Sequence, residues 1–225
     1  MTTTTPQQTR RKAEWPAPTG LILLAMIPVL AGASRLSVLA GGTSGPADSR
    51  FVDSPVPVIT HIISATIFCL LGALQFVPRL RRGRPSWHRI AGRVLVPAGL
   101  LAALSGMWMA VFYILPGTDG PVLLVERLIF GTVMIASLLL GLRAILRRDI
   151  STHSAWMRRA YAIGMGAGTQ VLLLAPWEIA FGKPDQAVRA VLMGLAWVIN
   201  LAVAEYFIQR SRTSGWRGAN RAAVR

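Results

Sequence analysis

The chain has 225 residues, of which 53% are hydrophobic and 15% are charged, and its mean hydropathy is +0.50. About a quarter of the residues of a soluble domain are charged, so this composition excludes a soluble enzyme, a disordered chain and a secreted disulfide scaffold. The single cysteine, Cys69, lies inside an apolar run and has no partner for an intramolecular disulfide. The composition predicts a multi-pass membrane protein.

Six apolar segments are each long enough to cross a bilayer, which takes roughly 20 residues of helix. None of them alternates with a period of two, as strands of a membrane barrel would. The sequence therefore predicts an all-α, polytopic bundle of six transmembrane helices. The expected organisation is a basic tail at 1–18, a transmembrane domain at 19–209 and a second basic tail at 210–225. The expected spans are 19–38, 58–77, 90–114, 122–146, 160–181 and 188–208.

The distribution of basic residues predicts the orientation of the spans. Of the 24 lysines and arginines, 19 fall in four clusters at 10–12, 79–93, 143–159 and 210–225, and an even number of spans places all four on one side. Basic residues mark the cytoplasmic side, so both termini are expected in the cytoplasm of a bacterial inner membrane. The net charge of +15 then reflects topology and attraction to anionic lipids at that face, and no nucleic-acid partner is expected. The remaining five are Arg35, Arg50, Arg127, Lys183 and Arg189.

The first span has two interpretations. This span resembles a cleavable signal peptide, because basic residues precede its apolar stretch and the small-residue triplet Ala31-Gly32-Ala33 follows. The apolar stretch continues beyond the triplet, however, toward Leu39. We expect an uncleaved first span, followed by an external loop at 40–57.

Of the three histidines in the chain, His61 is expected deepest in the bundle. It heads a stripe at helical spacing, so its face points inward; the stripe is formed by Ser64, Phe68, Gly72, Gln75 and Arg79. An ionisable group inside a membrane marks a functional site by default. The alternative is a neutral imidazole that bonds to a neighbouring helix.

His88 and His153 occur in similar contexts, each after a pair of arginines, near a tryptophan, and five residues before another arginine. Each opens a helix that runs from the cytoplasm outward. This similarity predicts a duplicated helical hairpin, in which spans four and five repeat spans two and three. Two histidines at equal depth are candidates for binding a cofactor together, although anchoring at the membrane interface explains them as well.

Arginines at these helix starts are candidates for binding anions or lipid headgroups, because free backbone N–H groups and the helix dipole attract negative charge. The candidates are Arg89, Arg93, Arg158 and Arg159. Gln75, Gln170 and Asn200 are expected in the polar interior of the bundle, and the last two either bond each other or line a cavity. Small residues recur at Gly92, Gly99 and Gly106 and at Ala160, Gly164 and Gly168, a spacing typical of close helix packing.

The chain resembles the bacterial membrane family called domain of unknown function 2306. The matching motifs are His61 followed by Gly72-Ala-Leu-Gln75-Phe76, then His88-Arg89-Ile-Ala-Gly92-Arg93, then His153-Ser-Ala-Trp156-Met157-Arg158-Arg159-Ala-Tyr161. Ser154 and Ala155 stand where members of the family more often carry His-Arg. The resemblance implies a multi-pass bacterial membrane protein and assigns no activity.

Two functions remain open at this stage. The first is a membrane redox protein that binds a b-type haem or a quinone through His61, His88 and His153, since paired histidines on helices are common axial ligands. The alternative is a transporter or anionic-lipid-interacting protein without a redox cofactor. No Walker, HExxH or CxxC pattern is present, so the sequence predicts no metal site and leaves the catalytic residues and the oligomeric state open.

Overall fold

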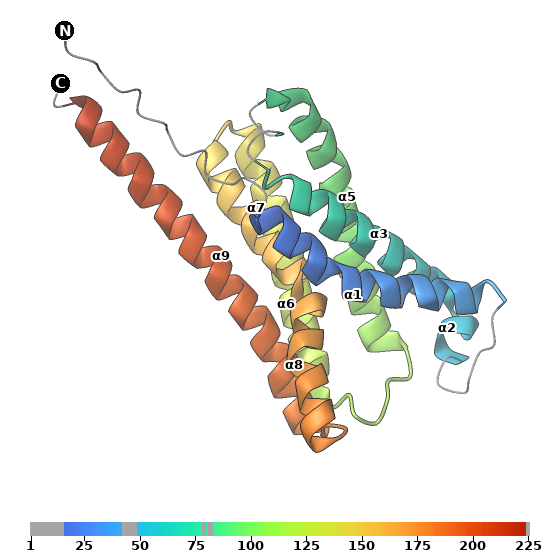
Figure 1. Ribbon diagram of the computed structural model, residues 1–225. Helices are drawn as coiled ribbons and strands as arrows, with labels where there is room; N and C mark the ends of the chain where they lie inside the picture. The colour runs from blue at the N-terminus through green and yellow to red at the C-terminus, as the bar shows by residue number, and fades with distance from the viewer. Residues whose placement is uncertain (1–15, 42–48, 78–79, 81–82, 224–225) are drawn as a thin grey trace, which may run out of the picture.

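The computed structural model describes residues 16–41, 49–77, 80 and 83–223, which form helices and, within these ranges, no strand. The helices lie side by side as a bundle, with α9 reaching well beyond it (Figure 1). They are α1 (Pro16–Leu39), α2 (Ser49–Asp53), α3 (Pro55–Leu74), α5 (Pro85–Phe112), α6 (Pro121–Leu146), α7 (Ile150–Gly164), α8 (Gly166–Phe181) and α9 (Gln186–Ala223).

Local sequence explains where these helices begin. Pro55, Pro85 and Pro121 each stand at the start of a long helix, where the fixed φ of proline suits the first turn and its missing N–H costs no hydrogen bond. The α7 helix instead begins after Asp149, whose carboxylate accepts a hydrogen bond from the backbone N–H of Thr152 at 3.0 Å. This cap satisfies one of the donors that a helix start leaves open.

Two helical hairpins, α3–α5 and α6–α7, account for the most extensive helix packing. The α5 helix joins them by packing on α6, and α7 also touches α3, α8 and α9. The α1 helix crosses α3 and reaches α8, while α9 lies along α6, α7 and α8 (Figure 1). Of the small residues predicted to mediate packing, Gly99 and Gly164 do so against Phe68, because a Cβ added at either would come within 2.7 Å of its ring. A Cβ at Gly92 would meet nothing within 4 Å, so this glycine does not mediate close packing.

The prediction of an all-helical membrane bundle is confirmed, with one change in the expected spans. Five helices are long and apolar enough to cross a membrane: α1, α3, α5, α6 and α9. The expected single span at 160–181 is instead two shorter helices, α7 and α8, which meet at Met165. Glycines on both sides of Met165 have low helix propensity, and this places the break inside the expected span.

Part of the predicted basic clusters lies outside the described residues. This applies to residues 1–15 of the expected N-terminal tail and to Arg79, Arg81 and Arg82 of the loop after α3. At the other end, the expected tail continues α9 as helix to Ala223.

Apolar side chains are distributed as lipid requires. The interior is filled largely by small or aromatic residues such as Ala73, Ala160 and Phe68. Many large aliphatic side chains are exposed, and Val56, Ile114 and Ile179 are 71%, 86% and 87% exposed. Exposed apolar surface on this scale marks contact with a membrane.

Candidate functional site: a central cavity lined by His61

A cavity of about 480 Å³ occupies one half of the bundle. It lies toward the end where α5 and α8 finish and α6 and α9 begin, which we call the Asp119 end after the loop residue found there. Its walls come from α1, α2, α3, α5, α6, α8 and α9, together with the break at Met165. A cavity of this size, apolar with a few convergent polar groups, is typical of a small-molecule site. We call it the central cavity.

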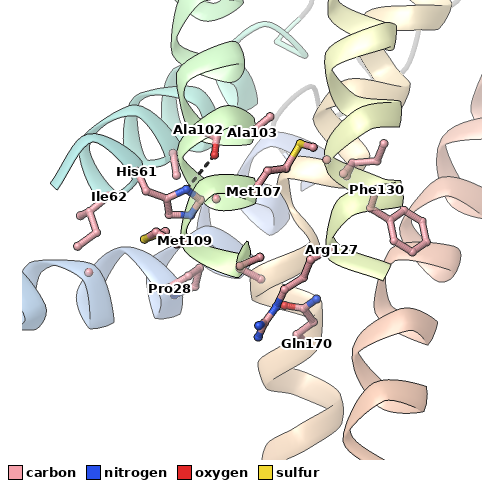
Figure 2. Close-up of a pocket in the computed structure, with 18 of the residues that line it drawn as sticks. Pro28, His61, Ile62, Ala102, Ala103, Met107, Met109, Arg127, Phe130 and Gln170 are labelled. Atoms are coloured by element: carbon pink, nitrogen blue, oxygen red, sulfur yellow. Dashed lines mark hydrogen bonds between the residues drawn. The ribbon is translucent and has the colours of Figure 1, made fainter. Parts of the chain in front are cut away.

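His61 is the one histidine of the three that lines the central cavity. It lies six residues into α3, about 9 Å along the helix axis at 1.5 Å per residue. Its Nδ1 donates a hydrogen bond to the Ala102 carbonyl of α5 at 2.9 Å, and the Ser105 hydroxyl lies 3.3 Å from the same nitrogen (Figure 2). Because a carbonyl only accepts, Nδ1 carries the proton and Nε2 keeps the lone pair. No described residue bonds Nε2, so this lone pair is available to a ligand.

The walls around His61 are soft and aromatic. Five methionines line the cavity, and Figure 2 shows Met107 and Met109 on the helix that faces the imidazole. Phe130 of α6 stacks on Trp197 of α9 with ring centroids 4.6 Å apart, and both line the cavity. Methionine thioethers adapt to irregular shapes and ligate soft or haem metal ions, so the walls fit a large apolar ligand. The five methionines are Met107, Met109, Met134, Met165 and Met193.

Charged side chains meet at the Asp119 end of the cavity. Asp119 lies in the loop between α5 and α6, and its side chain is only 4% exposed. Its carboxylate accepts a hydrogen bond from Arg127 Nη2 of α6 at 2.8 Å and another from Arg189 Nε of α9 at 2.7 Å. The amide of Gln186 also donates to the Gly117 carbonyl at 2.7 Å. The loop is therefore fastened to the starts of both helices.

The two arginines determine the charge state of Asp119. Burial raises its pKa, but the hydrogen bonds and positive charges of Arg127 and Arg189 outweigh this effect and hold the pKa of the carboxyl below its ordinary value. Because the pKa of Asp119 is lower in the folded protein than in the unfolded chain, the ionised carboxylate stabilises the fold at pH values above the ordinary pKa of aspartate. This stabilisation is lost only as the pH falls through the lowered pKa. Asp119 is therefore ionised at neutral pH.

Polar side chains of α8 and α9 lie near the helix break at Met165. The Asn200 amide of α9 donates to the Ala162 carbonyl at 3.1 Å, and its oxygen accepts from the Thr169 hydroxyl at 2.8 Å. Gln170 lines the cavity and donates to the Met193 carbonyl at 3.4 Å. Of the two predicted arrangements for Gln170 and Asn200, the structure therefore has Gln170 at the cavity and Asn200 bonded to the α7–α8 junction.

His88 and His153 lie elsewhere, each in the first turn of its helix, α5 or α7. Neither lines the central cavity. His153 Nδ1 donates to the Gly141 carbonyl of α6 at 2.9 Å, which links the two helices of the second hairpin. The structure thus separates His61 from the two histidines with which the sequence grouped it.

The predicted anion-binding arginines serve several roles in the structure. Arg159 makes a two-point contact with Glu205 of α9, at 2.5 Å from Nε and 3.0 Å from Nη2, and Arg158 donates to the Phe207 carbonyl and to Ser211. Both pairs fasten α7 to α9. Arg89 and Arg93 are exposed on α5. Gln75 ends α3, and its amide is buried without a hydrogen-bond partner among the described residues.

Sequence reasoning missed the cluster formed by Asp119, Arg127 and Arg189. A signal was present, since Arg127 and Arg189 are two of the five basic residues that fall outside the cytoplasmic clusters. Both also lie within apolar segments that otherwise carry few charges. Placing a charged side chain within a membrane segment costs free energy, and residues of this kind usually belong to a functional site.

The comparison with known families agrees with the resemblance seen in the motifs. The model of the family described as "Predicted membrane protein (DUF2306)" matches residues 58–208. No curated protein and no solved structure matches the chain. The match covers well over half of the residues, and the chain therefore belongs to this family.

Proposed function

We propose that this membrane protein of the DUF2306 family binds a redox group, a b-type haem or a quinone, in the central cavity, with His61 as the contact residue. The observation that carries the proposal is the state of the imidazole. Its Nδ1 donates to the Ala102 carbonyl, its Nε2 has no hydrogen-bond partner among the described residues, and the residue lines a cavity of about 480 Å³. A hydrogen bond from one ring nitrogen to a carbonyl is the usual way in which a protein orients a ligating histidine.

A haem fits the surroundings of His61 better than the helix-end histidines predicted from the sequence. Haem iron accepts a neutral imidazole and, in some proteins, a methionine sulfur as its two axial ligands. Met107 and Met109 line the same cavity as His61, whereas His88 and His153 do not. A quinone fits through the same nitrogen in its reduced form, because the Nε2 lone pair accepts a hydrogen bond from a quinol hydroxyl.

The absorbance of the purified protein tests this proposal. Expression with ample haem precursor should yield a protein with a Soret band, and His61→Ala should lose that band while still inserting into the membrane. His153→Ala is the matched control, since His153 lies outside the cavity, and it should retain the band. A colourless protein that retains a quinone, lost in His61→Ala, supports the quinone form. A wild-type protein that holds neither group contradicts the proposal.

Transport or lipid binding without a redox group is the second candidate function. It is favoured by the charged residues that line the cavity within the described part of the chain, which are Arg50, Arg127 and Arg189 and, with the opposite charge, Asp119. A neutral quinone does not use this positive charge. A protein that copurifies with an anionic lipid but with no haem or quinone would support this function.

For the membrane arrangement we propose six crossings in a bacterial inner membrane, with α7 and α8 together forming one broken span and both termini in the cytoplasm. Broken spans whose break lines a cavity are common in transporters, and residues on both sides of Met165 line this one. The packing of α3 with α5 and of α6 with α7 supports a duplicated hairpin. Exposed Arg89 and Arg93 near the start of α5 would then contact anionic lipids at the cytoplasmic face.

A further inference from the structure

The Asp119 end of the central cavity carries more positive charge than its own carboxylate neutralises. Arg127, Arg189 and Asp119 line this end of the cavity, and the two guanidiniums share the one carboxylate. Each oxygen of Asp119 accepts from a different arginine. The cluster is therefore an incompletely neutralised group at the wall of an apolar cavity, where charge interactions are strong.

The geometry leaves guanidinium donors open toward the cavity. A guanidinium has five N–H groups, and the contacts to Asp119 use Nη2 of Arg127 and Nε of Arg189. No other hydrogen bond within the described part of the chain uses Nη1 of Arg127 or the two Nη groups of Arg189. The side chains of Arg127 and Arg189 are 21% and 23% exposed, and both residues line the cavity.

Asp119 holds the two guanidiniums in fixed positions. The arginines come from different helices, α6 and α9, and the shared carboxylate prevents their mutual repulsion from separating them. Guanidinium groups presented in this way match carboxylate and phosphate oxygens, with which arginine forms short, charge-assisted hydrogen bonds. Gln170 adds an amide on the same cavity wall (Figure 2).

We propose that Arg127 and Arg189, positioned by Asp119, form an anion subsite that binds the carboxylate or phosphate group of an amphipathic ligand whose apolar body fills the central cavity. This inference rests on the proposed use of the cavity and adds the class of ligand. A haem has such a composition, since its apolar macrocycle carries two propionates. An anionic phospholipid has it as well, and the shared chemistry is an acidic group on an apolar body.

The first arm of the test compares haem with its dimethyl ester, in which both propionates are neutral. Arg127→Gln and Arg189→Gln should each weaken haem binding about tenfold, because a charge-assisted hydrogen bond is lost, and should leave binding of the ester unchanged. Arg143→Gln, an exposed change of the same charge near the opposite end of α6, should change neither. An equal loss for haem and ester would show that the arginines act only on structure and would overturn the subsite.

Asp119→Asn tests the positioning role of the carboxylate. It removes the charge that holds both arginines in place, so haem should bind several-fold more weakly while binding of the ester stays unchanged. A purely structural cluster predicts weaker binding of both ligands in this variant, because the loop loses its contacts to α6 and α9. Thermal unfolding in detergent, measured for each variant, separates misfolding from altered binding.

The second arm identifies the source of the anion and does not depend on haem. Native mass spectrometry of the protein in mixed phosphatidylglycerol and phosphatidylcholine should show retained phosphatidylglycerol that Arg189→Gln loses, if the ligand is a lipid. Wild-type protein that binds no haem but shows this pattern would contradict the haem form of the proposed function and keep the subsite. Equal retention of both lipids, together with unchanged haem binding in the arginine variants, would overturn the subsite itself.

Discussion

His61 has room for its imidazole because a glycine faces it. A Cβ built on Gly106 of α5 would lie 3.2 Å from His61 Cε1 and 3.3 Å from Nδ1. These distances are tighter than ordinary van der Waals contact, so only glycine leaves the ring in its present place. The hydrogen bond to Ala102, four residues earlier on α5, depends on that place.

Gly106→Leu should therefore displace the imidazole and abolish binding of the cavity ligand. Overpacking of this kind costs about 1–3 kcal/mol, so the melting temperature in detergent should fall as well. Gly92→Leu is the control on the same helix, because a Cβ at Gly92 meets nothing within 4 Å. Ligand binding that survives Gly106→Leu would mean that His61 does not contact the ligand.

The sequence identified His61 as inward-facing because side chains at helical spacing share one face. It could not select His61 over His88 and His153, since the choice depends on which helices enclose a cavity. The same limit applies to Asp119, a loop residue that gains its role only when α6 and α9 lie side by side. Asp119 contacts Arg127, 8 positions away, and Arg189, 70 positions away. Contacts at such separations produce no periodic pattern in the sequence.

At the scale of the element, the junction of α7 and α8 is the feature that hydropathy did not reveal. The predicted apolar segment at 160–181 is continuous, yet the helix breaks at Met165 between Gly164 and Gly166. Hydropathy describes how favourably side chains transfer into lipid, and its value does not depend on backbone hydrogen bonds. Thr169 N–H reaches the Met165 carbonyl only at 3.5 Å, and Asn200 of α9 supplies a donor to the Ala162 carbonyl instead.

Asn200→Leu should destabilise this junction. It removes the hydrogen bonds to Ala162 and Thr169, and hydrogen bonds between membrane helices contribute about 0.6–2 kcal/mol each. The expected result is a lower unfolding free energy in detergent and faster proteolysis or cysteine labelling near Met165. Thr169→Ser retains its hydroxyl and should behave like the wild type, whereas Thr169→Val should lose part of the stability. Equal stability of the Leu and Ser variants would show that the junction does not rely on Asn200.

At the scale of the whole molecule, the five long apolar helices were predictable because lipid imposes length and composition on each crossing. Their arrangement was not, since the interior is filled by small residues whose contacts depend on shape. One such contact joins distant parts of the chain: a Cβ at Gly168 of α8 would clash with the Leu24 carbonyl of α1. The first helix thereby becomes part of the cavity wall, although the family match begins only at residue 58.

The orientation of the whole molecule gives a final prediction. If α7 and α8 form one broken span, the chain crosses six times, and the ends of α6 and α9 lie on the same side as the clustered arginines. Reporter fusions at Arg148 and Arg217 should then report the cytoplasm, and fusions at Ser49 and Asp185 the opposite side, because 19 of the 24 basic residues fall on one side in this arrangement. The Asp119 end of the cavity would accordingly face outward. If α7 and α8 instead return to the side from which they came, Asp185 and Arg148 will report the same compartment. That outcome would contradict both the six-crossing arrangement and the contact of Arg189, near the start of α9, with Asp119.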